Sequence, residues 1–305
     1  MNESAQDGPS NRSWALSGLS LGLVVITSLW TYVAWLSNSH LFDFKRLQLF
    51  LTHHTDILAS LLAFSVGITL ILLLHEAGHL LTGGESVRGA PLWLPAPGLY
   101  IPSLGGFQRT QGPVDMPHPG RYAIMGPLCG ITGAITCLIV GSFILSDTPY
   151  LLRIEMTSQS PLIQLLTVTG LGPDLNSLQV AGWMGLLLSS LQLLPVGATD
   201  GGQIIRAIAP KLHSSISLIT LCLFTLLAFT FPVAKGFTWW AWAVLSSLHL
   251  LGNPIIEEAY TPTLIKRIIL GMVWFLLFFG TLTVSIDAIP TAVIPEANIS
   301  QEVEL

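Results

Sequence analysis

Long apolar runs alternate with short polar segments along the 305-residue chain. A run of about 20 apolar residues is long enough to cross a lipid bilayer as a helix. Runs that approach or reach this length occupy 14–36, 57–82, 122–145, 178–196, 216–231, 237–251 and 268–286. Because 216–231 and 237–251 are short, they also fit one helical hairpin. The pattern predicts an all-α integral membrane protein, a polytopic bundle of about six to seven transmembrane helices.

Residues 83–120 interrupt this pattern with seven prolines and eight glycines. They cannot form a spanning helix, because proline removes a backbone donor and clashes with the preceding turn. The stretch 91–107 (PLWLPAPGLYIPSLGGF) is nevertheless too apolar for a solvated loop. We expect a Pro/Gly-rich extended or hairpin segment that re-enters the membrane where protein covers it, since lipid cannot satisfy its backbone groups.

The same pattern divides the chain into five parts. Residues 1–13 are polar and are expected to form a mobile tail. The first transmembrane helix and a polar connection are expected at 14–56, and a core that carries the motifs below at 57–205. The C-terminal transmembrane helices are expected at 206–290, after a short amphipathic helix at 203–211. An acidic tail at 291–305 ends the chain.

Composition agrees with a membrane protein and argues against other classes. Hydrophobic residues make up 51% of the chain and charged residues 10%, against about 25% charged residues in ordinary soluble proteins. The net charge is −5, and no basic patch with interleaved aromatic residues is present, so nucleic acid is not expected as a partner. The three cysteines lie inside apolar runs, which indicates no disulfide framework.

The candidate chemistry is concentrated in the stretch 70–81 (LILLLHEAGHLL). In a helix, His75 and His79 are about 40° apart around the axis and one turn apart along it, so both imidazoles face one side. This spacing suits one zinc ion per chain. Glu76, about 100° from His75, is placed to act as a general base without binding the metal. The alternative is a buried histidine pair that hydrogen-bonds to neighbouring carbonyls.

Two considerations extend this site. An unpaired acidic residue in an apolar helix costs about 2.5–3.5 kcal/mol, which favours a bound metal.

A catalytic zinc needs about three protein ligands, and the motif supplies two. Asp200 is the candidate third ligand, because it follows the run 178–196. Glu85 is the fallback, although it is expected to face water. Asp200, followed by two glycines, can alternatively cap the next helix.

The distribution of positive charge orients the predicted helices. With a cytoplasmic amino terminus, eight Lys and Arg residues lie in inside segments and four in outside segments, as the positive-inside rule favours. The runs 57–82 and 178–196 then both cross from outside to inside, so their carboxyl ends meet at one depth. The candidate ligands are therefore expected toward the cytoplasmic side of a multi-pass protein embedded in the lipid bilayer.

Three motifs, taken in order, resemble those of the site-2 proteases, a family of intramembrane zinc metalloproteases. They are HExxH at 75–79, GPxxG at 126–130, and Pro195 followed by Asp200 and Gly201. The Pro-rich insert before GPxxG and the sequence LPVG most resemble the corresponding segments of the plant chloroplast and cyanobacterial branch. The match covers roughly residues 70–205. Beyond it, the chain matches the family by hydropathy alone.

The resemblance implies an endopeptidase that cuts transmembrane segments of other proteins, with zinc on His75, His79 and Asp200 and with Glu76 as the base. Gln192 stands at an Asn position of the family, and Thr199 stands at a Leu position. Gln192 keeps the amide, so it is a candidate for holding substrate.

A substrate helix must unwind before its peptide bonds can be attacked. The extended stretch 92–107, which includes Gly105 and Gly106, is a candidate to pair with the unwound segment by strand addition. These two glycines and Gln192 are the expected substrate-binding residues.

Two other functions fit the pattern less well. A non-proteolytic membrane scaffold or chaperone could retain the metal site as part of its fold. A transporter could use a metal or ion site near the bilayer midplane, but transporters usually show broken helices in two repeats, and this chain shows no such repeat.

Overall fold

The computed structural model describes residues 11–37, 43–83, 90–97, 101–107, 119–144, 150–154, 160–168, 170–230, 243, 246–247, 262–281 and 291–293. Its α-helices are α1 (Asn11–Leu36), α2 (Phe44–His53), α3 (Leu58–Gly83), α4 (Pro119–Ile144), α5 (Pro161–Thr167), α6 (Ser177–Gln192), α7 (Asp200–Ile208), α8 (His213–Thr230) and α10 (Leu264–Thr281). Two short 3-10 helices are η1 (Thr55–Ile57) and η4 (Pro210–Leu212). The strands are β1 (Leu92–Pro95), β2 (Ser103–Phe107), β3 (Leu151–Arg153), β4 (Asp174–Leu175) and β5 (Thr291–Val293).

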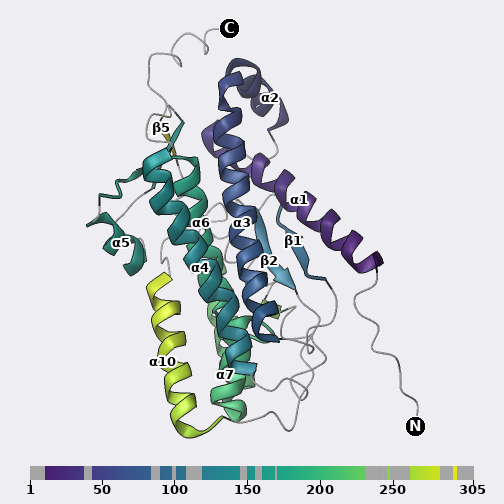
Figure 1. Ribbon diagram of the computed structural model, residues 1–305, viewed down its shortest axis with the longest axis vertical. Coiled ribbons are helices and arrows are strands. Elements are labelled where there is room, and N and C mark those ends of the chain that lie inside the picture. The colour runs from purple at the N-terminus through teal and green to yellow at the C-terminus, as the bar shows by residue number, and fades with distance from the viewer. Residues whose placement is uncertain are drawn as a thin grey trace.

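The centre of the bundle consists of α3, α4 and α6, which lie side by side (Figure 1) and pack against one another. Nearly all of α6 is buried, as expected for a helix that is apolar around its whole circumference. Glycines allow the close approach: a Cβ on Gly78 of α3 would overlap the Met125 carbonyl of α4, and Gly182 of α6 meets α4 in the same way. α3 and α6 run in the same direction, so their carboxyl ends lie at the same end of the bundle.

Five described helices are long and apolar enough to cross a membrane: Ser13–Leu36, Leu58–Gly83, Gly120–Ile144, Pro210–Thr230 and Leu264–Thr281. The chain therefore fits an all-α, multi-pass membrane bundle. The run expected at 178–196 corresponds to α6, which ends earlier, at Gln192. The run expected at 237–251 lies almost entirely outside the described residues. The count of six to seven helices therefore stays a prediction, as do the five-part division and the orientation.

Three segments outside the predicted transmembrane helices contain regular structure. The connection after α1 includes α2, where the Asp43 side chain accepts a hydrogen bond from the Arg46 backbone N–H at 3.0 Å. The segment 146–176 includes β3, α5 and β4, and part of the expected acidic tail forms β5, which pairs with β3. The pattern does not reveal these elements, because they are short and β3 pairs with a strand far away in the sequence.

The described part of the Pro/Gly-rich segment is an antiparallel hairpin, β1–β2, with an irregular register between Trp93 and Pro95. This agrees with the extended or hairpin structure expected there, whereas its re-entry into the membrane stays a prediction. The hairpin is attached to α1: the Trp93 N–H donates to Ser20 Oγ at 3.2 Å, and Thr27 Oγ1 donates to the Pro102 carbonyl at 2.7 Å. α1 therefore covers β1, and β2 lies on the side of α3 and α6 (Figure 1).

Candidate metal centre

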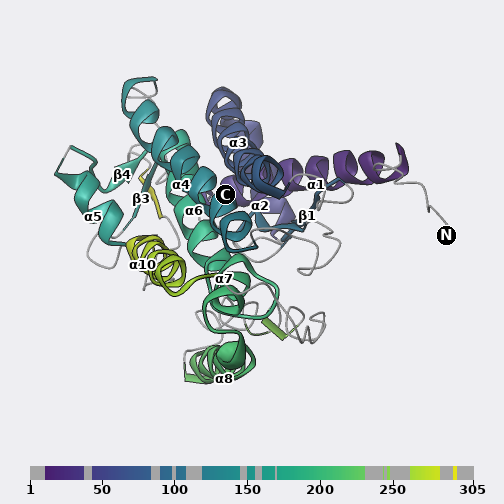
Figure 2. The same cartoon turned by 60° about the horizontal axis from the view of Figure 1, so that its bottom comes forward.

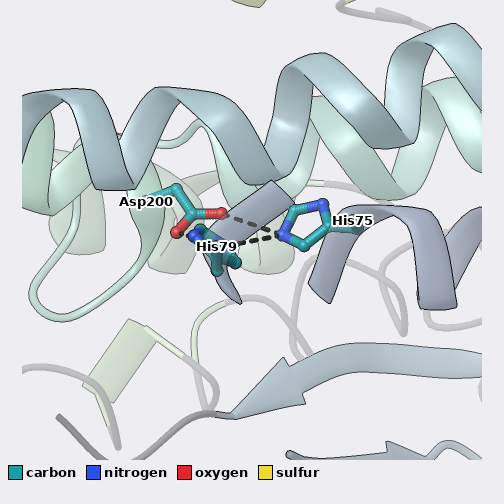
Figure 3. Close-up of side chains that lie close together, drawn as sticks. All are labelled: His75, His79 and Asp200. Carbon is teal, nitrogen blue, oxygen red and sulfur yellow. Dashed lines mark hydrogen bonds and ion pairs between the residues drawn. The ribbon is translucent and has the colours of Figure 1, made fainter. Parts of the chain in front are cut away.

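His75 and His79 lie in the last turns of α3, and their rings converge from one face of the helix (Figure 3). Their Nε2 atoms are 3.2 Å apart. Both side chains are buried, at 8% and 5% exposure. The i, i+4 spacing of the motif therefore produces the shared face that helix geometry predicts.

Asp200 reaches this face from the first turn of α7. Its Oδ2 lies 3.1 Å from His75 Nε2 and its Oδ1 lies 3.3 Å from His79 Nε2. The cap of α7 is the preceding residue, because Thr199 Oγ1 accepts a hydrogen bond from the Gly202 N–H at 3.1 Å. The interpretation of Asp200 as a mere helix cap is therefore wrong. Thr199, which departs from the family's Leu, takes that role and leaves the carboxylate available to the two imidazoles.

The spacing of these three groups fits a metal site. His75, His79 and Asp200 each offer a ligand atom within 4.8 Å of the others. Ligands about 2.0–2.1 Å from a tetrahedral zinc ion lie about 3.3 Å from one another, close to the 3.1–3.3 Å separations found here. Two imidazoles and a carboxylate are also a donor set that zinc takes. The residues therefore fit one zinc ion.

The second nitrogen of His79 fixes the orientation of its ring. Nδ1 lies 3.1 Å from the Tyr122 carbonyl of α4, and because a carbonyl only accepts, Nδ1 carries the proton. The Nε2 lone pair then points toward the cluster, as in many metal sites in which an outer hydrogen bond sets the tautomer. The Tyr122 ring also packs on His79, with centroids 4.6 Å apart. Tyr122 is four residues before Gly126, so the spacing could have indicated that both face α3.

Glycines of the GPxxG motif make room for the two imidazoles. A Cβ on Gly126 would overlap the His79 ring, and one on Gly130 would lie 3.1 Å from His75 Nδ1. The motif is thus adjacent to the cluster without contributing a ligand. The glycines therefore let α4 pack closely against the end of α3 that carries the histidines.

Electrostatics in the cluster favour an ionised Asp200. Burial by itself raises the pKa of this carboxyl, but His79 and His75, when protonated, outweigh this effect through their charge and hydrogen bonds and hold the pKa below its usual range. An ionised carboxylate is the form that binds a metal.

Glu76 is buried at 3% exposure and lies beside the hairpin, because a Cβ on Gly106 would overlap its carboxylate. It is not one of the three residues whose ligand atoms cluster in the described part of the chain. This position agrees with a carboxylate next to a metal site, and its role as general base stays a prediction.

The expected substrate-binding residues, Gln192, Gly105 and Gly106, lie on the His75 side of the cluster. Gln192 Nε2 donates to the Leu104 carbonyl of β2 at 3.1 Å, and the backbone of Gly105 touches the Gln192 amide. A narrow cavity of about 10 Å³, room for about one water molecule, lies at this position. Its lining comprises Ile71, Leu72, His75, Gly105, Gly106, Leu188, Ser189 and Gln192. The fallback ligand Glu85 lies outside the described residues.

Comparison with known proteins adds a family relationship to this geometry. The chain is similar to the probable zinc metalloprotease EGY1, chloroplastic, of Arabidopsis thaliana (26% identity over 160 residues, 48% of this chain and 29% of that protein). It is also similar to EGY2 of Arabidopsis thaliana (27% over 266 residues, 82% and 45%) and of Oryza sativa subsp. indica (30% over 205 residues, 62% and 36%), both named probable chloroplastic zinc metalloproteases.

The chain spans less than half the length of these relatives. No protein-family model matches it, and no solved structure matches it significantly. The relatives confirm the resemblance to the plant chloroplast branch of the site-2 protease family, and their names support a zinc metalloprotease function.

Proposed function

We propose that this relative of the chloroplast zinc metalloproteases is an intramembrane zinc endopeptidase that cuts peptide bonds within or near transmembrane segments of other membrane proteins. The observation that carries the proposal is the convergence of His75, His79 and Asp200 inside the apolar helices α3, α4 and α6, with Glu76 one residue from the first ligand. A buried carboxylate and two buried imidazoles are costly in such surroundings unless they bind something.

Each of these residues has a separate proposed role in hydrolysis. His75, His79 and Asp200 would hold the zinc ion, which when bound polarises a peptide carbonyl and makes water more acidic. Glu76 accepts the proton of the attacking water and returns it to the leaving amine. The Tyr122 carbonyl holds the His79 ring in orientation, and the surrounding helices exclude bulk water. We place this site toward the cytoplasmic side, on the strength of the charge distribution.

The hairpin is the proposed substrate platform. Gln192 donates to the Leu104 carbonyl, so this carbonyl points toward α6 and away from β1. In an antiparallel pair the N–H and C=O of one residue point to the same side. The edge of β2 at Leu104 therefore faces Gln192 of α6, next to the small cavity beside His75, while α1 covers β1. We infer that an unwound substrate segment pairs with this edge in place of the Gln192 amide. The missing side chains of Gly105 and Gly106 bring β2 into contact with Gln192 and Glu76, and so bring the proposed edge close to the cluster.

A proline in β2 tests this pairing. Leu104→Pro removes the N–H on the edge that faces Gln192, and we expect cleavage to fall by at least about tenfold, the equivalent of one backbone hydrogen bond of about 1.4 kcal/mol. Zinc content should stay unchanged. Leu104→Ala is the matched control, because it shortens the side chain and keeps the backbone. Equal cleavage by the proline variant and the control would exclude strand addition at this residue.

The proposed function is tested with purified protein in detergent. Metal analysis should find about one zinc per chain, and a panel of single-span substrates should include at least one that is cut within or near its span. Chelation should abolish the cut, and added zinc should restore it. One zinc per chain without cleavage of any substrate favours the scaffold alternative, and no bound zinc contradicts the proposal.

A further inference from the structure

We propose that α8 and α10, which supply none of the candidate ligands, position Asp200 through a clasp on the turn that precedes it. The turn is Leu193–Thr199 and connects α6 with α7. The clasp residues are Trp274 of α10 with His213 and Ser217 of α8. This inference rests on the proposed zinc site. It adds positioning residues for one ligand.

Three hydrogen bonds hold the turn from outside the α3, α4 and α6 core. Trp274 Nε1 donates to the Leu193 carbonyl at 2.9 Å, at the start of the turn. His213 Nε2 donates to the Gly197 carbonyl at 3.1 Å, and the Gly197 N–H donates to Ser217 Oγ at 3.0 Å. The clasp therefore holds the turn at its first residue, Leu193, and at Gly197, two residues before its end.

The position of the turn determines where the backbone places Asp200, because the turn packs against the two glycines that follow Asp200. A Cβ on Gly201 would overlap the Leu193 carbonyl, and one on Gly202 would overlap the Gly197 carbonyl. The two carbonyls that the clasp binds are thus the same carbonyls on which the first turn of α7 rests. Asp200 precedes these glycines, so a shift at either carbonyl moves the backbone that carries the carboxylate.

Contacts within the turn make it a stiff unit. The single hydroxyl proton of Thr199 is shared between the carbonyls of Leu194 and Val196, which lie 2.6 and 2.8 Å from Oγ1, while Oγ1 accepts from the Gly202 N–H and caps α7. Gly197 has φ +49°, in the left-handed region that glycine adopts without strain. A stiff turn held at two points supports a geometry such as the 3.1–3.3 Å cluster.

The helices of the clasp are otherwise largely exposed on the bundle surface. Most of the α8 and α10 residues face outward, yet His213 and Ser217 are buried at 6% and 0% exposure. Buried polar groups on such a helix are unfavourable unless they are paired, and here both bond to Gly197. Figure 2 shows α8 and α10 near α7, outside the α3, α4 and α6 core. The pairing therefore links two surface helices to a ligand of the proposed metal site.

The expected effect is on metal affinity. Loss of a partner that orients a metal ligand typically weakens binding by about 10–100-fold, and the clasp acts one step farther out. We expect Trp274→Phe, which keeps the aromatic packing and removes only the N–H donor, to weaken zinc binding by about threefold to tenfold. We expect His213→Leu combined with Ser217→Ala to weaken it by about tenfold or more.

The experiment measures the zinc dissociation constant of the full chain by competition with a chelator, together with the visible absorption of the cobalt-substituted protein. His213→Gln keeps a side-chain N–H donor and should retain more affinity than His213→Leu. Asn176→Ala is the control for a loss of stability alone. It removes the cap of α6 and a 2.8 Å bond to the Gly141 carbonyl, about 24 Å along α6 from Gln192.

The outcomes separate the clasp from the proposed function. Weaker zinc binding and an altered cobalt spectrum in the clasp variants, with both unchanged in Asn176→Ala, support the clasp. If the unsubstituted protein binds zinc and the clasp variants bind it equally well, or no worse than Asn176→Ala, the clasp is overturned and the proposed function stands. If the unsubstituted protein binds no zinc, the proposed function fails and the clasp fails with it.

Discussion

Glu76→Gln is expected to abolish peptide hydrolysis and to leave the zinc content unchanged. Glutamine has the shape of glutamate but cannot accept the proton of an attacking water. General acid–base catalysis contributes about 10²–10⁴-fold to such reactions, so the rate should fall by at least this factor. Because Glu76 is not among the three clustered ligand residues, the substitution leaves the metal ligands in place. Initial cleavage rates of a single-span substrate and metal analysis of the same sample measure both parts.

The matched control is another carboxylate changed to its amide. Asp174→Asn alters a partly exposed group that pairs with Arg153 at 2.7 Å, near the β3–β4 strands and away from α3, and cleavage should be unchanged. If Glu76→Gln cuts at the full rate, Glu76 is not the base. If it loses zinc as well as activity, Glu76 acts as a ligand or supports one.

The local part of the site could be predicted from the sequence because helix geometry alone places its residues. His75 and His79 share a face through their four-residue spacing, and they do so in the structure. The meeting with Asp200 depends on more distant information, namely that two apolar runs cross the membrane in the same direction. The Asp200 carboxylate does lie within 3.3 Å of both imidazoles.

The rest of the site depends on contacts that carry no local signal. Tyr122 orients His79 although the two residues are 43 positions apart. The bond from Trp274 to Leu193 joins residues 81 positions apart. Hydropathy reports burial along each helix and does not report which polar groups on different helices meet. It therefore misses the hydrogen bonds that set the site's geometry.

The prediction of the fold from the sequence has the same limit. α3 begins and ends one residue from the limits of the apolar run that predicts it, whereas α1 and α4 each begin three residues before theirs. The run expected to continue to 196 stops at Gln192, because Pro195 and the turn around Gly197 end the helix while the residues remain apolar. β5 could not be predicted from its own three residues, since its pairing with β3 depends on a segment about 140 positions earlier.

Asp200→Asn is expected to weaken zinc binding by more than the 10–100-fold that loss of an outer partner costs. The amide keeps the size of the side chain but removes the negative charge that offsets part of the metal's charge between two imidazoles 3.2 Å apart. Cleavage should be lost with the metal and should return in part at high zinc concentration. Glu76→Gln, by contrast, should not respond to added zinc, which distinguishes a ligand from a base.

Thermal unfolding with and without zinc gives a second measurement of the same prediction. A ligand that binds only the folded state stabilises it by about 2.7 kcal/mol at 100 times its dissociation constant, so zinc should raise the Tm of the unsubstituted protein and of Asp174→Asn. Asp200→Asn should show little or no increase at the same zinc concentration. An equal increase in Asp200→Asn would mean that the imidazoles bind zinc with a different third ligand. The 3.1 and 3.3 Å contacts of the Asp200 carboxylate would then reflect an ion pair with the histidines and no metal coordination.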